Sequence, residues 1–160
     1  MAQDIFLNLT GIEGEAMDSR HPNEIDVLSW NWDVTQPSSM HAGTGAGAGK
    51  CTVHDLVIEH YVDRATPNLV QHCLTGKHIS EAVLVARKAG GTPLEFLKIT
   101  MEDVLVSRVK TMCTPHMRAP REQVSLSFAR VKQEYVIQNA QGGSAGAVSV
   151  GYDIKANKAI

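Results

Sequence analysis

Apolar and polar residues alternate at every second position along much of the chain, and this period predicts β-strands. The stretch 24–34, EIDVLSWNWDV, shows it most clearly. It predicts one half-buried strand with an apolar side against the core and a polar side facing away. The apolar side carries Leu28, Trp30, Trp32 and Val34, and the polar side carries Ser29, Asn31 and Asp33.

The same alternation predicts further strands elsewhere in the chain. Four of them cover residues 4–9, 52–62, 122–137 and 147–155. Two more are expected over 79–88 and 94–109, the second with a break inside it. Ser80-Glu81-Ala82 and Gly90-Gly91 could also bracket a short helix, so both alternatives stay open for the first of these two segments.

One helix is signalled over residues 66–76. Thr66 offers a hydroxyl cap, Pro67 suits the first helical position, and Gly76 follows the end. The apolar stripe of this helix is Leu69, Val70, Cys73 and Leu74. The chain is therefore predicted to be mainly antiparallel β, a barrel or sandwich with one attached helix. We expect a single domain over residues 1–160, since no linker or internal repeat divides it.

The glycine-rich stretch GTGAGAGKC, residues 43–51, invites comparison with a phosphate-binding loop. That motif requires glycine where this chain has Thr44, and Ser or Thr where it has Cys51. It also requires a helix after Lys50, whereas the following residues are β-branched at strand spacing. The stretch is therefore predicted to be a long connection between two strands, and not a nucleotide site.

Charge and composition exclude several classes of protein. Fifteen Lys and Arg against seventeen Asp and Glu leave a net charge of −2, without a run of like charge. That balance argues against a nucleic-acid or anionic-membrane surface. No segment approaches the roughly 20 apolar residues of a membrane span, and the N-terminus lacks the basic start of a signal peptide. A soluble protein made in the cytosol is expected, with Cys51, Cys73 and Cys113 as reduced thiols.

A candidate metal or catalytic cluster lies in GEAMDSRH. Glu15, Asp18 and His21 stand three residues apart and would share one face of a helix. Flanking glycines and a proline favour an irregular turn instead, in which Asp18 and Ser19 bond the local backbone. Asp18, Ser19 and His21 are also too close in sequence to form a nucleophilic triad, whose members normally come from separate elements.

Other titratable residues offer no better constellation. His54 and His60 fall on the same strand face as Leu56 and Ile58, and we expect both histidines to be partly buried packing residues. Nothing in the pattern brings together any two of the carboxylates of Glu102, Asp103 and Glu122. No catalytic residue, metal site or cofactor is predicted.

Taken together, the segments of the chain resemble a known family. The carrying stretches are residues 1–50, RATPNLVQHCLTGKHISEAVLVARKAGG, ITMEDVLVSRVKTM, EQVSLSFARVKQEY and VGYDIKAN, in collinear order over essentially the whole chain. The sequence is identified as a member of the Hcp family, the haemolysin co-regulated proteins of type VI secretion systems. Pro37 and Thr44 are small departures within the glycine-rich loop.

The resemblance implies a β-barrel of two packed sheets with a flanking helix, a fold shared with contractile-phage tail tubes. It also implies a homohexameric ring that stacks into the inner tube of the secretion system. The tube would lie inside a contractile sheath, meet a baseplate and a trimeric spike, and carry small effectors in its lumen. It would leave the cell without a cleaved signal peptide, with no nucleic acid bound and no membrane inserted. The alternative reading is a small β-sandwich binding module without enzymatic activity.

The resemblance also assigns two sets of residues. Ser29 and Asn31 would face the lumen of the ring. The stretch 36–51 would reach the adjacent ring, and its four glycines carry no side chains that would hinder close backbone approach. The ring-to-ring contact residues are Met40, His41, Gly43, Gly45, Gly47, Gly49 and Lys50.

Overall fold

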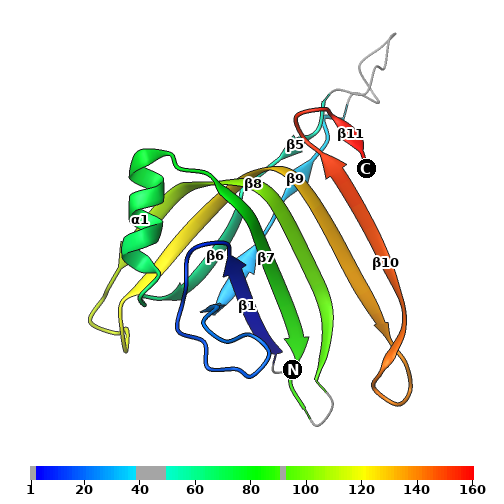
Figure 1. Cartoon of the computed structure of the whole chain (residues 1–160), viewed down its shortest axis with the longest axis horizontal. Coiled ribbons are helices and arrows are strands. Elements are labelled where there is room, and N and C mark those ends of the chain that lie inside the picture. The colour runs from blue at the N-terminus through cyan, green and yellow to red at the C-terminus, as the bar shows by residue number, and fades with distance from the viewer. Residues whose placement is uncertain (1–2, 39–49, 91–92) are drawn as a thin grey trace.

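The computed structural model describes residues 3–38, 50–90 and 93–160 (Figure 1). Its elements are β1 (Gln3–Leu9), β2 (Ile25–Asp26), β3 (Ser29–Asn31), β4 (Val34–Thr35), β5 (Thr52–Val53), β6 (Leu56–Tyr61), α1 (Thr66–Thr75), β7 (Ile79–Lys88), β8 (Leu94–Met112), β9 (Arg121–Gln138), β10 (Ser144–Asp153) and β11 (Lys158–Ala159). The chain is thus mainly β with one short helix, as predicted.

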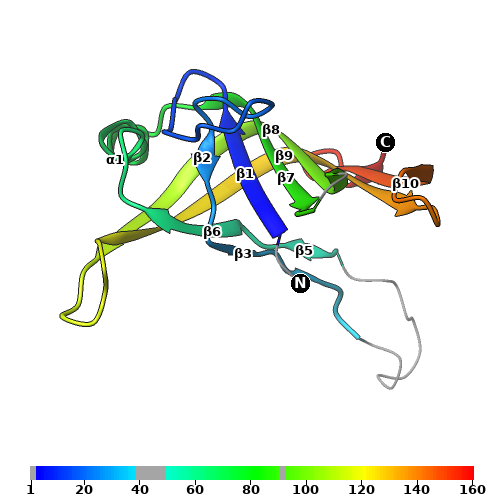
Figure 2. The ribbon, with the colours of Figure 1, turned by 90° about the horizontal axis from the view of Figure 1, so that it is seen from below.

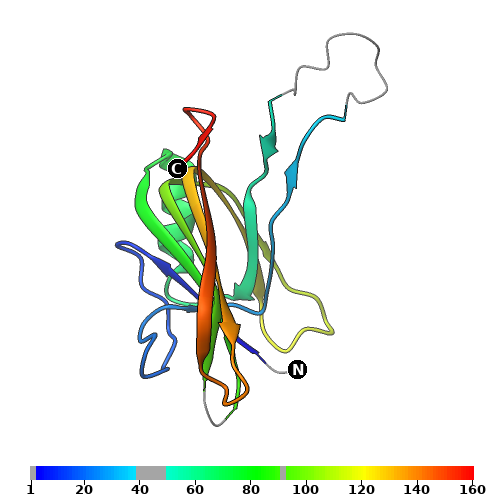
Figure 3. The same cartoon turned by 90° about the vertical axis from the view of Figure 1, so that its right-hand side faces the viewer.

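All strand pairs are antiparallel. The main sheet runs in the order β11-β10-β9-β8-β7-β1-β2, and β6 joins it by pairing with both β9 and β3. The short strands β4 and β5 pair only with each other and extend away from the rest of the molecule as an arm (Figure 3). We call residues 32–38 and 50–55 the arm.

A single segment, residues 25–31, joins the two ends of the barrel. Its first half pairs with β1, and the Val27 amide donates to the Ile5 carbonyl at 2.9 Å. Its second half pairs with β6, starting from the Leu28 amide, which donates to the Glu59 carbonyl at 2.8 Å. Two packed layers result, with β6 and β3 on one side and β1 and β7 on the other (Figure 2). The expected mainly antiparallel β fold with one short helix is confirmed, and its two layers belong to one nine-stranded sheet that folds over on itself.

The core lies between these layers and follows the period of two in each strand. Leu56, Ile58 and His60 of β6 point inward, and Val57 and Glu59 between them are only partly buried. Each fully buried leucine or isoleucine contributes about 2 kcal/mol relative to an exposed one. The largest apolar side chains with almost no exposure are Leu7, Ile25, Leu56, Ile58, Leu69, Ile79, Leu84, Ile99, Met101 and Leu126.

The helix α1 matches the predicted segment but differs in its details. It ends at Gly76, whose φ of 67° is the left-handed conformation that glycine tolerates best. Thr66 does not cap it: Ala65 is the N-cap residue, and the Ala65 amide donates to Asp63 Oδ1 at 2.8 Å. Leu74 is 81% exposed, so the predicted apolar stripe is wrong at that position. The helix packs against the core through Leu69, which is buried, and Cys73, which is partly buried.

The segments 79–88 and 94–109 are both strands, which removes the helical alternative. The break expected inside the second segment is a pair of distortions within one continuous strand, β8. Asp103 has a φ of 55°, and the pairing with β9 shifts register between Val106 and Arg108. Such irregularities bend a strand and strengthen its twist without ending it.

The strand predicted over 24–34 is instead divided into β2, β3 and β4. The alternation of inward and outward side chains is interrupted at Val27 and Leu28, whose amides hydrogen-bond to opposite layers. Odd-numbered residues face inward before this point, and even-numbered residues face inward after it. Trp30 and Trp32 pack against the core as expected. Leu28, at 42% exposed, does not, and its assignment to the apolar face was wrong. Val34 is 51% exposed but lies on the same side as Trp32, with which it lines an apolar cavity, and it pairs with Val53, which packs against the core.

Candidate functional site

A projecting part of the sheet presents the most exposed apolar surface beside the barrel. We call residues 133–138 of β9 and 144–153 of β10 the wing. The wing continues from the barrel as a two-stranded hairpin (Figure 1). Its exposed apolar side chains are Tyr135 (47%), Ile137 (43%), Val148 (63%) and Val150 (61%), which we call the apolar stripe.

Strand register places this stripe on the side of the sheet that faces the core within the barrel. Val150 lies opposite Gln133, which lies opposite the fully buried Ile99. One step outward, Val148 lies opposite Tyr135. Directly opposed residues in adjacent strands point to the same face. The core-facing side therefore runs out of the barrel into the wing, where no described element covers it.

The outer edge of the wing is also open. Within the described residues, β10 pairs along this edge only with β11, through Tyr152 and Asp153, and Gly151 accepts one bond from Ile160. The backbone groups of residues 144–150 along that edge have no strand beside them. An open edge next to an apolar face is a surface suited to another polypeptide chain.

Ser29 and Asn31 both lie exposed on β3, on the opposite side from Trp30. They pair with Glu59 and Val57 of β6. Their outward orientation agrees with the predicted two-faced strand.

An apolar cavity of 310 Å³ lies between the arm and the start of the wing. Trp32, Val34 and Val53 line it from the arm, and Val131 and Val150 line it from the sheet. The thiol of Cys51 lies 3.8 Å from the hydroxyl of Tyr152 at the same place. Apart from Cys51, Gln133 and Tyr152 the cavity is lined by apolar residues and Gly151, so we regard it as part of the apolar surface at the base of the wing.

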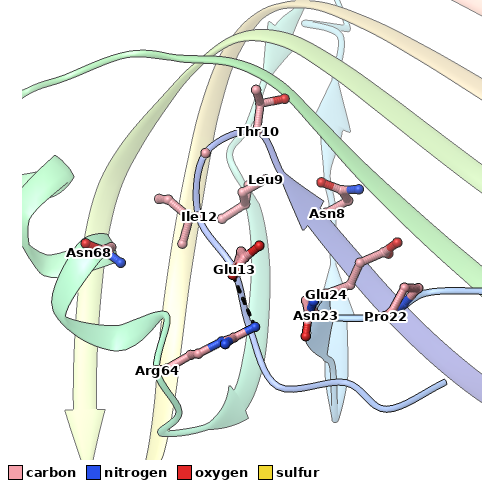
Figure 4. A pocket seen from close by; sticks show the side chains of 11 residues that line it. Asn8, Leu9, Thr10, Ile12, Glu13, Pro22, Asn23, Glu24, Arg64 and Asn68 are labelled. Carbon is pink, nitrogen blue, oxygen red and sulfur yellow. Dashed lines mark ion pairs between the residues drawn. The ribbon is translucent and has the colours of Figure 1, made fainter.

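A larger, polar cavity of 640 Å³ separates the turn after β1 from the beginning of α1 (Figure 4). Across it, Glu13 and Arg64 form an ion pair of 3.3 Å in which both side chains are about half exposed or more. Exposed pairs of this kind contribute little to stability. The remaining polar lining consists of Asn8, Thr10, Asn23, Glu24 and Asn68.

The cluster Glu15, Asp18 and His21 does not converge on one point. Asp18 accepts hydrogen bonds from the backbone of Arg20 and from the buried guanidinium of Arg87, whose nearer nitrogen lies at 2.6 Å. The bond to Arg87 is the main cause that holds the pKa of Asp18 far below its ordinary value. Glu15 turns away and accepts from the Arg64 amide. The predicted irregular turn and the local backbone bond of Asp18 are thus confirmed.

His21 is buried, although the sequence pattern gave no sign of this. Its ring stacks on Phe6 with 4.5 Å between centroids. Nδ1 lies 3.0 Å from Glu24, and Nε2 lies 2.6 Å from Glu95. The two carboxylates fix the ring and tie the loop 10–24 to β8. Within the described part of the chain, no three His, Cys, Asp or Glu side chains gather to hold a metal ion.

The two strand histidines behave differently from each other. His60 is fully buried and pairs with the equally buried Glu122, with 2.9 Å between Nε2 and Oε1. His54 lies in the arm, is 45% exposed in its side chain, and contacts the Thr35 hydroxyl at 3.3 Å. The prediction of a partly buried packing histidine was wrong for His54, because β5 ends before it.

Comparison with known proteins now decides the family. A family described as "Type VI secretion system effector, Hcp" matches residues 6–135. Protein hcp1 of Pseudomonas aeruginosa is 44% identical over 159 residues, which is 98% of each chain. The chain belongs to the Hcp family.

Solved structures agree with this assignment. The crystal structure of Hcp1 from Salmonella typhimurium is 48% identical, covers 100% of both chains and superposes with a TM-score of 0.81. A type VI secretion system effector from Yersinia pestis is 41% identical, covers 94% of this chain and 99% of its own, and has a TM-score of 0.78. A structure described as a type six secretion system protein reaches a TM-score of 0.93 at 25% identity, covering 99% and 100%.

Membership in the Hcp family agrees with the remaining sequence predictions at a coarse level. The family consists of structural and secreted proteins of type VI secretion, which fits the absence of any predicted catalytic role. Among the described residues, no helix is long and apolar enough to cross a membrane. All three cysteines are free thiols, as expected.

Of the glycine-rich stretch 43–51, only Lys50 and Cys51 lie within the described residues. Met40, His41 and the glycines at 43, 45, 47 and 49 lie outside the described residues. Lys50 is exposed, and Thr52 begins a strand where a phosphate-binding loop would require a helix. The prediction of a connection between strands therefore holds at its C-terminal end.

Proposed function

We propose that this Hcp-family chain is the subunit of a homohexameric ring, and that rings stack into the inner tube of a type VI secretion system. The observation that carries the proposal is the apolar stripe of the wing. Four large apolar side chains continue the core-facing side of the sheet, yet they are 43–63% exposed in the described chain.

A ring supplies the missing cover. In a closed ring, each copy presents one surface to the next copy and a different surface to the previous one. The stripe and the open edge of β10 would form the first surface, so that each wing lies against the barrel of its neighbour. Stacking of rings repeats a second unlike contact along the axis, and that contact does not close.

Further partners follow from the family resemblance and belong to the same proposal. A contractile sheath would surround the tube, a baseplate would seat it, and a trimeric spike would cap it. Small effectors would travel in the lumen, and the tube would be exported without a cleaved signal peptide. The glycine-rich loop, including Lys50, would contact the adjacent ring.

The ring can be tested at the stripe. Changing both Val148 and Val150 to glutamate would bring two charges into the subunit contact, where an unpaired charge is costly. We expect the hexamer to give way to folded monomers, with subunit affinity reduced by at least about a hundredfold, or about 3 kcal/mol. Native mass spectrometry at micromolar concentration would measure this, and circular dichroism would confirm that the barrel remains folded.

The control is Leu74→Glu, which places one such charge at an exposed apolar position on α1, outside the stripe. This variant should keep the hexamer. A wild-type chain that remains monomeric at every concentration tried would contradict the ring and favour the alternative, a small β-sandwich binding module. Hexamers that survive the double substitution would show that the stripe is not the contact.

A second prediction concerns the lumen. If Asn31 lines the bore together with Ser29, then Asn31→Asp would place six carboxylates around one ring. We expect weaker retention of an acidic effector, by about tenfold in co-purification, since like charges repel across a narrow channel. Asn31→Gln keeps the amide and serves as the control. Loss of the hexamer in Asn31→Asp would instead assign the residue a structural role.

A further inference from the structure

The apolar stripe of the wing needs an unlike surface to receive it in a closed ring, and that surface must lie elsewhere on the same chain. β9 is one continuous strand that begins at Arg121 and carries the wing at its C-terminal end. At roughly 3.3 Å per residue, Arg121 and Tyr135 are about 45 Å apart along this strand. The start of β9 therefore lies on the flank of the barrel opposite the wing (Figure 1).

The end of β6 meets the start of β9 on this flank. Tyr61 pairs with Arg121, and the Val62 amide donates to the Pro120 carbonyl at 3.0 Å. Tyr61 and Val62 are 38% and 39% exposed, and Pro120 is also exposed. We call Tyr61, Val62, Pro120 and Arg121 the receiving surface. It presents three partly apolar side chains beside one cation.

Arg121 holds the Tyr61 ring and keeps hydrogen-bond donors for a partner. Its guanidinium carbon lies 5.5 Å from the centroid of the Tyr61 ring, which is a cation–π arrangement. Nη1 lies 3.3 Å from Glu59, and Nη2 has no partner within the described part of the chain. Tyrosine and arginine are among the side chains that contribute most to the binding energy of protein interfaces. Such a pre-positioned pair suits the centre of a contact between subunits.

We propose that the receiving surface binds the wing of the neighbouring copy. The inference rests on the proposed ring and names the second surface of its contact. Tyr61, Val62 and Pro120 would cover the apolar stripe, and the guanidinium of Arg121 would donate to carbonyl groups along the open edge of β10. The wing gains cover for its apolar side chains and donors for its edge, and Arg121 gains acceptors.

The positions of the two surfaces also fix the direction of assembly. They lie at opposite ends of β9, so a copy cannot place its own stripe on its own receiving surface. Two copies joined stripe to stripe would stop at a pair and leave both receiving surfaces open. Contact between unlike surfaces instead leaves one of each kind at the ends of a growing assembly until the ring closes.

Truncation of the receiving surface tests the inference in the full-length protein. Tyr61→Ala combined with Arg121→Ala should weaken subunit association at least about a hundredfold, since central tyrosine and arginine side chains are costly to remove from an interface. Native mass spectrometry measures the loss of hexamers, and circular dichroism checks that the barrel remains folded. Tyr61→Phe keeps the aromatic side chain and should keep the hexamer.

The matched control is Arg130→Ala. Arg130 lies on the same strand, its side chain is 41% exposed, and it pairs with Glu102 at 2.9 Å, but it lies outside the receiving surface. This variant should retain the subunit affinity of the wild type within about twofold, as expected for a site without a shared contact.

Mixing two assembly-deficient variants tests which surfaces meet. The variant with Val148→Glu and Val150→Glu keeps its receiving surface, and the variant with Tyr61→Ala and Arg121→Ala keeps its stripe. Each alone should be monomeric. An equimolar mixture should form dimers with one copy of each, because one intact contact remains and no third copy can add to it.

The outcomes separate this inference from the ring itself. Hexamers that survive Tyr61→Ala with Arg121→Ala would overturn the receiving surface and leave the ring in place. Two monomeric variants that form no dimer when mixed would show that the stripe and the receiving surface are not partners. An equal loss in Arg130→Ala would also overturn the assignment. A wild-type chain without hexamers would contradict the proposed function instead.

Discussion

Glu122→Ala is expected to lower the free energy of unfolding by about 3–5 kcal/mol, the cost of leaving one member of a buried ion pair without its partner. Both His60 and Glu122 are fully buried. Their bond of 2.9 Å joins β6 to β9, and Glu122 also accepts from the hydroxyls of Thr66 and Thr111 at 3.3 Å. Removing the carboxylate therefore takes away the closest partner of the buried His60 imidazole and an acceptor of the Thr66 hydroxyl.

Urea unfolding at pH 7, followed by circular dichroism, measures this loss. Glu59→Ala is the matched control, because Glu59 lies on β6 facing outward and pairs with the half-exposed Arg121 at 3.3 Å. This pair is partly exposed, so we expect its loss to cost about 1 kcal/mol, less than the loss of the fully buried pair. If the two variants lose equal stability, the buried pair does not hold the layers together as described.

The same pair predicts how stability varies with pH. Burial by itself would lower the pKa of His60, but the nearby carboxylates of Asp63 and Glu122 raise that pKa from 6.5 to about 9. A raised pKa in the folded state stabilises the protein fully below pH 6.5, and this contribution is lost as pH rises through about 9. The expected loss is about 3 kcal/mol across that window. His60→Gln should flatten the profile, and an unchanged slope in this variant would contradict the assignment.

Gly14→Ala is the second substitution with a large expected effect. A Cβ atom at Gly14 would lie 2.5 Å from the carbonyl oxygen of Glu24 and 2.9 Å from the Cα of Ile25. Both are backbone atoms at the start of β2, so they cannot move aside by changing a rotamer. We expect a loss of about 3 kcal/mol or more, as is typical of forcing atoms into a closely packed region. Thermal and urea unfolding would report it.

Gly143→Ala provides the control for this prediction. A Cβ atom there would come no closer than 3.4 Å, to the side chain of Asn139, and the residue lies in the exposed β9–β10 turn. Its stability should stay within about 0.5 kcal/mol of the wild type, as for ordinary surface substitutions. A Gly14→Ala protein as stable as Gly143→Ala would show that the loop 10–24 adapts freely.

The fold was predictable in those segments whose structure follows from the local sequence pattern without long-range packing. Alternation located β1, β7, β9 and β10, because each runs as a continuous strand. It failed at Leu28, where the backbone leaves one layer for the other within two residues. It failed at Leu74, where the apolar stripe of α1 extends past the surface that it covers. Both errors depend on long-range packing, which a local period does not contain.

The candidate surface was predictable only in part. Ser29 and Asn31 followed from the polar side of a strand. The apolar stripe did not, because Tyr135, Val148 and Val150 have the same alternation whether a sheet continues into a core or leaves it. The buried His60–Glu122 pair was also missed, since the two residues are 62 positions apart and meet only through the pairing of β6 with β9.

The way the wing is joined to the barrel determines which surface a single copy exposes before assembly. β8 and β9 are single continuous strands that belong to the barrel at one end and support the wing at the other. Because both strands are continuous from the barrel into the wing, a single folded copy keeps the apolar stripe of the wing exposed. In the proposed ring, assembly would cover this apolar surface, and a copy that stays alone would carry an exposed patch of the kind that promotes aggregation.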